Sequence, residues 1–158
     1  MKGLSIKELQ IRQFKADDIA AISEIEHLSF KDPFPSYFLS QLADANPDTF
    51  LVAVIRDKIV GYVVIDKWPD QDHLASIAVI PESRMKGVGQ AMLDHLIERL
   101  DSGSLKLEVR RSNSAALELY RKNGFIQTGV AHSYYPDGED AIQMQKVLEK
   151  PAEILATA

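Results

Sequence analysis

The residues best suited to proton transfer lie in the second half of the sequence. Glu108 stands between Leu107 and Val109 in the run LKLEVR, so strand alternation turns its carboxylate away from two apolar neighbours. Such a carboxylate could accept a proton from an amine, directly or through a water molecule. It could equally be a solvated strand residue beside Lys106 and Arg110.

A second chemical signal is the run SIAVIPESRMKGVGQAML, in which an apolar strand pattern leads through two glycines into a helix pattern. Glycine lets the backbone approach a ligand closely, and a helix N-terminus offers unpaired N–H groups and the positive end of a dipole. Together these features predict an anion site suited to a diphosphate, with Arg84 and Lys86 adding positive charge. The run lacks the Gly-Lys-Ser/Thr of a Walker loop and the third glycine of the dinucleotide fingerprint. A tight turn before a helix is the alternative interpretation.

Hydrophobic periodicity predicts the elements that must hold these residues. Pro33 and Pro35 separate two early helices, and Asn113 or Ser112 can cap a later one. The predicted order is β-α-α-β-β-β-α-β-α-β-β, an α/β arrangement. The expected segments are a strand around 9–11, helices over 17–28 and up to 42, two strands in 49–66 joined at 56–58, a strand over 73–80, a helix over 87–100, a strand over 105–110, a helix ending at 124, and strands over 124–131 and 140–148.

Composition narrows the class of protein. The 158 residues predict a single domain over 1–150 followed by a tail over 151–158. A net charge of −5 argues against a general nucleic-acid binder. The chain contains no cysteine, and its four histidines show no metal-ligand spacing. Because the sequence has neither a bilayer-length apolar run nor a secretory signal, we expect a cytoplasmic protein with no membrane partner.

Taken together, the motifs resemble the GNAT acetyltransferase superfamily. Arg-x-x-Gly-x-Gly after an Ala-Val strand end is similar to its acyl-CoA motif, and LEVRRSNSAALELYRKNGF sharpens the match. The run SYYPDGEDAIQMQKVL is similar to the ribosomal-protein-alanine (RimI) and arrest-defective-type N-terminal acetyltransferases, and the resemblance covers residues 6–148. It implies the GNAT fold, a mixed, mostly antiparallel seven-stranded sheet with four helices, and acetyl-CoA as cofactor without a metal.

The resemblance also implies roles for individual residues. Glu108 would be the base, at the opening where the fourth and fifth strands splay apart. The family pattern Asn-x-x-Ala-x-x-x-Tyr would put Tyr120 at the thioester sulfur as general acid or orienting donor, although most helix tyrosines only pack. The expected cofactor-binding residues are Ile77, Ala78, Val79, Arg84, Met85, Lys86, Gly87, Val88, Gly89, Gln90, Asn113, Ala116 and Tyr120.

The acceptor amine would meet a different set of residues. Tyr134 and Tyr135 match the tyrosine pair at the peptide entrance of N-terminal acetyltransferases, and Phe34 and Pro35 would form the opposite wall. Their alternative roles are ordinary loop anchoring and core packing. His73 is a candidate accessory base on the substrate side, or a structural histidine.

We therefore predict transfer of an acetyl group from acetyl-CoA to the N-terminal α-amine of a protein, with a ribosomal protein as one candidate. One alternative is a GNAT enzyme that acts on a lysine or a small-molecule amine. Another is a non-catalytic acyl-CoA-binding module, because one fold hosts many functions. The sequence does not predict an oligomeric state.

Overall fold

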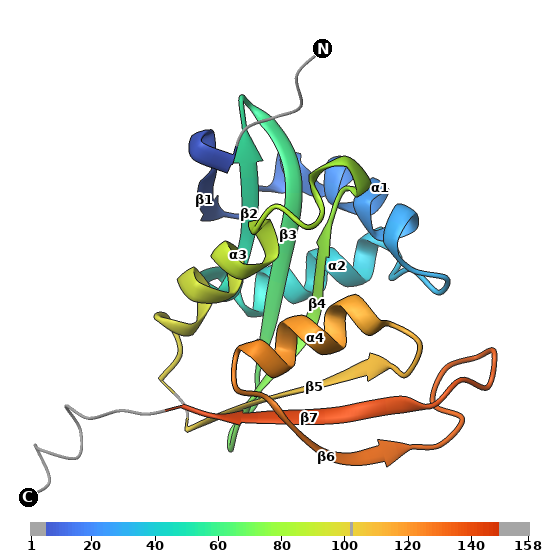
Figure 1. The fold of residues 1–158 in the computed structure, drawn as a ribbon. Helices are drawn as coiled ribbons and strands as arrows, with labels where there is room; N and C mark the ends of the chain where they lie inside the picture. The colour runs from blue at the N-terminus through green and yellow to red at the C-terminus, as the bar shows by residue number, and fades with distance from the viewer. Residues whose placement is uncertain (1–5, 102, 149–158) are drawn as a thin grey trace, which may run out of the picture. The chain divides into compact units, whose positions relative to one another are not determined.

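The computed structural model describes residues 6–101 and 103–148, and its elements follow the predicted order. The strands form a seven-stranded mixed sheet in the order β1-β2-β3-β4-β5-β7-β6, so the predicted fold class is confirmed (Figure 1). The elements are β1 Gln10–Gln13, α1 Ile19–Ser29, α2 Ser36–Ala45, β2 Phe50–Ile55, β3 Lys58–Lys67, β4 Asp72–Val79, α3 Val88–Ile97, β5 Ser104–Arg110, α4 Ser114–Lys122, β6 Ile126–Ala131 and β7 Ala141–Val147.

Contacts within the chain divide the described residues into two compact units. Unit 1 contains residues 6–66 and 74–100, and unit 2 contains residues 67–73, 101 and 103–148. The division runs through β4, whose first two residues belong to unit 2. The single domain over 1–150 stays a prediction, and the predicted tail over 151–158 lies outside the described residues.

Unit 1 is built on the β2–β3 hairpin. The run FLVAVI forms β2 and is buried at every position except Val54, as expected for a strand covered on both faces. Ile55 pairs with Lys58 across a two-residue turn. Both turn residues, Arg56 and Asp57, have positive φ, at 50° and 65°, which is the conformation of a type I′ hairpin turn.

The helices of unit 1 cover the two faces of its strands, with α3 on one side and α2 on the other (Figure 1). Apolar side chains at helical spacing point to the core, including Ile22 and Ile25 from α1 and Leu93 and Leu96 from α3. The predicted helix over 87–100 is shorter in the structure and ends at Ile97, although Leu100 remains buried.

Unit 2 brings the start of β4 beside β5. Asp72 pairs with Leu105 and His73 with Lys106, in parallel, while β5 and β6 each pair antiparallel with β7. The side chain of Asn113 accepts the N–H of Ala116 at 3.2 Å and so caps α4. This confirms the predicted cap and fixes where α4 starts.

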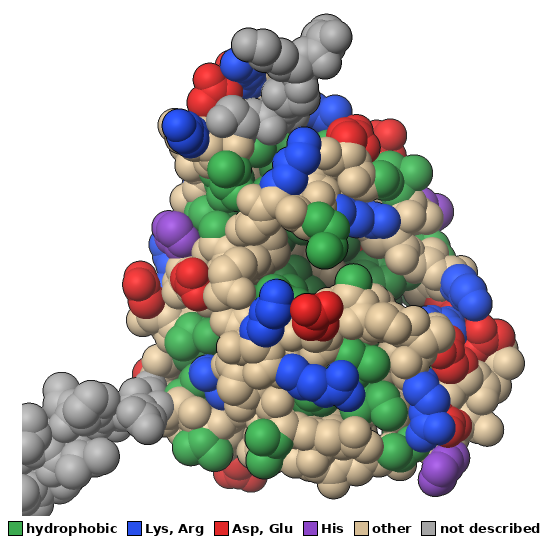
Figure 2. Space-filling view, viewed as in Figure 1, with side chains coloured by type: hydrophobic (Ala, Val, Ile, Leu, Met, Phe, Trp, Pro, Cys, Tyr) green, Lys and Arg blue, Asp and Glu red, His purple; other side chains and the backbone are tan. Residues whose placement is uncertain are grey.

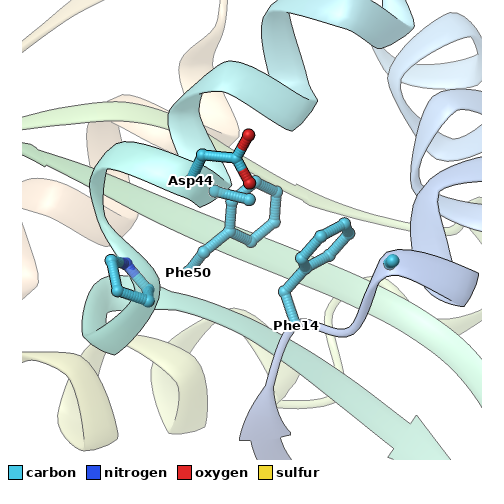
Figure 3. Close-up of a pocket in the computed structure, with 6 residues that line it drawn as sticks. Phe14, Asp44 and Phe50 are labelled. Atoms are coloured by element: carbon cyan, nitrogen blue, oxygen red, sulfur yellow. The ribbon is translucent and has the colours of Figure 1, made fainter.

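The molecular surface carries acidic and basic side chains interspersed on the face drawn in Figure 2. A hollow of about 200 Å³ in unit 1 lies between Phe14, Asp44 and Phe50 (Figure 3), and none of the predicted site residues lines it. No helix within the described residues is long and apolar enough to cross a membrane.

Candidate active site

The turn before α3 has the backbone geometry expected of an anion site. Gly87 is the N-cap residue with φ +90°, and the preceding Met85 also has a positive φ of 63°. The first helical hydrogen bond runs from Ala91 N–H to Gly87 C=O at 3.0 Å. The N–H groups of Val88 and Gly89 therefore precede the helical ladder and point out of the helix end, where an anion could accept from them.

Arg84 fastens this turn to the end of β4. Its Nε donates to the carbonyl oxygen of Val79 at 2.8 Å, and its terminal nitrogen donates to Ser29 Oγ at 3.2 Å. Lys86 is exposed, and Met85 is 91% exposed. Arg84 thus holds the turn in shape and supplies charge, while Lys86 supplies charge alone.

The other predicted cofactor-binding residues of unit 1 differ in whether their side chains are accessible to a ligand. Ala78 and Val88 are 7% and 2% exposed. Their side chains pack in the core, so only their backbone atoms could contact a ligand. Ile77 and Val79 alternate with Ala78 and are half-buried. Gln90 contacts Asp94 through its side-chain amide at 3.0 Å.

In unit 2, Glu108 lies at the centre of a polar cluster. Its Oε1 is 2.6 Å from His73 Nε2, and its Oε2 is 3.8 Å from Lys106 Nζ. Its side chain is 12% exposed, while its strand neighbours Leu107 and Val109 are buried. The predicted alternation is confirmed, and Glu108 is a partnered carboxylate rather than a freely solvated one.

The surroundings of Glu108 act on its acidity in opposite directions. Burial raises the pKa of this carboxyl, but the hydrogen bond and charge of His73, followed by those of Lys106, outweigh burial and hold the pKa below its usual range. Glu108 is therefore ionised at neutral pH. An ionised carboxylate can attract an ammonium group and accept hydrogen bonds from it.

The tyrosine predicted at the thioester sulfur is almost fully enclosed in unit 2. Tyr120 is 4% exposed and meets Phe125 edge-on, with ring centroids 5.5 Å apart. Burial, and then the nearby Tyr135, raise the pKa of Tyr120. Its hydroxyl consequently keeps its proton at neutral pH and can act as a hydrogen-bond donor.

The tyrosine pair lies in the loop between β6 and β7. The rings of Tyr134 and Tyr135 meet edge-to-face with centroids 5.0 Å apart, and Arg110 lies over the Tyr135 ring at 4.1 Å. Burial, and then the charge of Glu108, raise the pKa of Tyr134, while burial raises the pKa of Tyr135 to about 12. Both phenols are neutral near physiological pH.

Glu139 ties this loop to β5. It accepts from Arg110 at 2.7 Å and from the backbone N–H of Ser112 at 2.8 Å. The hydrogen bonds from Ser112 and Arg110 lower the pKa of Glu139 to about 2. The loop that carries the tyrosine pair is thus held by a carboxylate that stays charged well below neutral pH.

The predicted wall formed by Phe34 and Pro35 belongs to unit 1, between α1 and α2. Phe34 is half-buried and packs on Phe38 with ring centroids 4.9 Å apart, while Pro35 is exposed at the start of α2. The backbone N–H of Phe34 donates to Glu26 at 2.8 Å. Neither residue is a fully buried core residue.

Glu26 and Trp68 were not identified from the sequence. Glu26 is 2% exposed and accepts hydrogen bonds from Tyr62, Ser76 and Phe34. Its helical face carries Ile22 and Ile25, so the sequence showed no partner for a charge there.

Trp68 stacks on His73 with ring centroids 4.6 Å apart. Trp68 could have been singled out in the sequence because it is the one tryptophan and because it stands in the turn-forming run WPDQD, where a large aromatic residue is unusual.

Comparisons with known proteins give consistent matches. Residues 19–125 match the pattern of the Acetyltransferase (GNAT) family. The chain is 32% identical over 154 residues to an N-alpha-acetyltransferase of Sulfurisphaera tokodaii, covering 87% of this chain and 92% of the relative. Ard1 from Thermoplasma volcanium has a TM-score of 0.87 at 27% identity, covering 90% of this chain and 99% of that one. The ribosomal-protein-S18-alanine N-acetyltransferase from Escherichia coli has a TM-score of 0.79 at 30% identity, covering 90% and 95%.

Proposed function

The chain belongs to the acetyltransferase (GNAT) family, and from this membership we propose that it transfers the acetyl group of acetyl-CoA to the N-terminal α-amine of proteins. The observation that carries the proposal is the pair formed by His73 and Glu108, at 2.6 Å. Relatives named N-alpha-acetyltransferase support the choice of acceptor.

The chemistry of Glu108 favours an α-amine over a lysine. A carboxylate whose pKa is lowered is a weak base, so it is best matched to an amine that needs little help. An α-amine of pKa 7.7–8.0 is neutral in about one molecule in ten at pH 7, whereas a lysine of pKa 10.4 is neutral in roughly one in 2,500. Glu108 orients the amine and takes its proton directly or through a water molecule.

Tyr120 acts on the other side of the reaction. When bound, acetyl-CoA supplies an acetyl group activated as a thioester. A thiol has an ordinary pKa of about 8.5, well below that of Tyr120, which burial raises further. Full proton transfer from Tyr120 to a thiolate is therefore uphill, and its role is that of a hydrogen-bond donor to sulfur.

The residues of the turn before α3 fit the diphosphate of coenzyme A. The left-handed Gly87 aims the N–H groups of Val88 and Gly89 outward, and the dipole of the ten-residue α3 favours an anion there. Lys86 and Arg84 add charge beside it. The turn supplies affinity for the cofactor and takes no part in proton transfer.

The finer identity of the acceptor is also part of the proposal. We propose cytoplasmic proteins with a free N-terminus as substrates, a ribosomal protein among them. Support for the latter is the 30% identity to the ribosomal-protein-S18-alanine N-acetyltransferase of Escherichia coli.

The test is acetylation of matched peptides by the purified enzyme with acetyl-CoA. One peptide carries a free N-terminus and no lysine, and the other has a blocked N-terminus and one internal lysine. Mass spectrometry should find the acetyl group on the first peptide, with kcat/KM at least about tenfold above that for the second. Product on the lysine peptide alone would contradict the proposal and favour a lysine or small-amine acetyltransferase, and coenzyme binding without turnover would leave only a binding module.

A further inference from the structure

Trp68 occupies an unexpected place for the tryptophan of this chain. It lies in the turn between β3 and β4, where its backbone N–H donates to the carbonyl oxygen of Gln71 at 3.0 Å. The side chain is 38% exposed, so it does not serve as a core residue. The role of Trp68 must therefore be sought in the side chains that its indole contacts.

The indole touches the two groups that hold Glu108. The imidazole of His73 stacks on it at 4.6 Å between centroids and 20° between planes, and Lys106 Nζ lies 5.1 Å from the ring centroid. His73 Nε2 is 2.6 Å from one carboxylate oxygen of Glu108, and Lys106 Nζ is 3.8 Å from the other. One aromatic ring therefore supports both partners of the same carboxylate.

We propose that Trp68 is a positioning residue whose indole keeps His73 and Lys106 against the two oxygens of Glu108. The proposal rests on the proposed function, in which Glu108 receives the proton of the amine. Stacking fixes the rotation of the imidazole, and a cation–π contact restrains the long lysine side chain.

The remaining neighbours of Glu108 cannot take over this task. The ionisable groups that face it are His73, Lys106, Tyr134 and Tyr135. The residue opposite Glu108 on β7 is the uncharged Gln143, and the two tyrosines are neutral near physiological pH, so neither offers the carboxylate a positive charge. His73 and Lys106 are thus the groups that keep Glu108 ionised, and both contact Trp68.

Kinetics against pH test the proposal, with Trp68→Ala, Trp68→Phe and the control Ile126→Ala. Ile126 is 65% exposed in the same unit and has no place in the site. Trp68→Ala should lower kcat/KM for the peptide by about 10- to 100-fold, since small misplacements of catalytic groups cost this much, and should move the acidic limb of the profile to higher pH. Trp68→Phe should recover part of both effects, because phenylalanine also stacks. A uniform loss with an unmoved limb would overturn the proposal.

A second measurement separates this proposal from the proposed function. In the resting protein, the NMR signals of the His73 ring should show the upfield displacement caused by a stacked indole, and Trp68→Ala should abolish it and raise the pH at which the Glu108 side-chain carboxyl titrates. This result would support the positioning role even if no peptide were acetylated. An unchanged Glu108 titration in Trp68→Ala would overturn it, whether or not the wild-type enzyme acetylates peptides.

Discussion

A glutamate on a β-strand face acquires its chemistry from the side chains that face it. Glu108 would be an ordinary carboxylate if Lys106, its neighbour on the same strand, were its sole partner. The parallel register adds His73 from β4, and the bond between them at 2.6 Å lowers the pKa of Glu108 despite burial. The result is a carboxylate that is charged at neutral pH.

The first prediction concerns the charge of Glu108. Glu108→Gln should lower kcat by about 10²-fold or more, in line with loss of a positioned base, and should leave the affinity for acetyl-CoA nearly unchanged. The loss should be largest at acidic pH, because there few substrate amines are already neutral. Steady-state kinetics across pH and calorimetry with coenzyme A measure the two effects.

The matched control for this prediction is Glu118→Gln. Glu118 is an exposed glutamate of α4 that pairs with Lys122 at 3.4 Å, and its loss should leave the kinetics unchanged. Equal rate losses in both variants, or an unaltered pH profile in Glu108→Gln, would remove Glu108 from the role of base.

For single residues, the direction of a side chain on its strand was predictable from the sequence, but its contacts across strands were not. Alternation within LKLEVR is a local property, so the direction of Glu108 was predictable and is confirmed. The contacts of His73 with Glu108 and Trp68 were not predictable, because they depend on which residues of β4 and β5 are paired. Strand register is set by the packing of whole strands, and no short motif records it.

At the scale of elements, the turn before α3 depends on one backbone conformation. Gly87 has φ +90°, which costs a residue with a Cβ roughly 1–2 kcal/mol, although a Cβ there would meet Ile6 at an acceptable 3.5 Å. Gly87→Val should therefore lower the free energy of unfolding by about that amount and weaken binding of coenzyme A by about tenfold or more. Thermal unfolding and calorimetry are the measurements.

Gly87→Asn is the comparison variant, because asparagine tolerates the left-handed region. It should retain most of the stability and affinity that Gly87→Val loses. Unchanged coenzyme affinity in Gly87→Val would place the diphosphate elsewhere.

The loop between β6 and β7 gives a prediction of its own. Glu139→Gln removes the charge that holds Arg110, so the tyrosine pair should be less well ordered and KM for the peptide should rise about tenfold, with KM for acetyl-CoA unchanged. The pKa of Glu139 is about 2 in the folded protein against a usual 4.5. Glu139 therefore stays charged, and keeps its ion pair with Arg110, until the pH falls through about 2. Mild acidification of the wild-type enzyme should therefore not reproduce the mutant's KM.

The elements themselves were largely predictable. The predicted order contains every α-helix and β-strand of the described residues, and Pro33 with Pro35 marked the break between α1 and α2. The β2–β3 turn was placed correctly, but its conformation was not foreseen because Arg56 and Asp57 are not the glycine and asparagine that such turns favour. The end of α3 was set three residues late, since Leu100 continues the apolar stripe after the helix has ended.

At the scale of the whole molecule, charge is the property that acts beyond contact distance. The net charge of −5 gives the enzyme a field that attracts cationic substrates and repels anionic ones. This field cannot choose the reacting amine, which the site residues must do. It can change how often substrates of different charge arrive.

The last prediction follows from this field. Two peptides with the same first four residues, one followed by lysines and the other by glutamates, should differ in kcat/KM at low salt in favour of the lysine peptide. Because screening shortens the Debye length from about 30 Å at 0.01 M salt to about 8 Å at 0.15 M, the advantage should shrink several-fold as salt is added. The lysine side chains are acetylated beforehand in a control peptide, which should lose the advantage at every salt concentration. If the lysine and glutamate peptides keep one ratio of kcat/KM at all salt concentrations, long-range attraction plays no part and the preference comes from direct contacts.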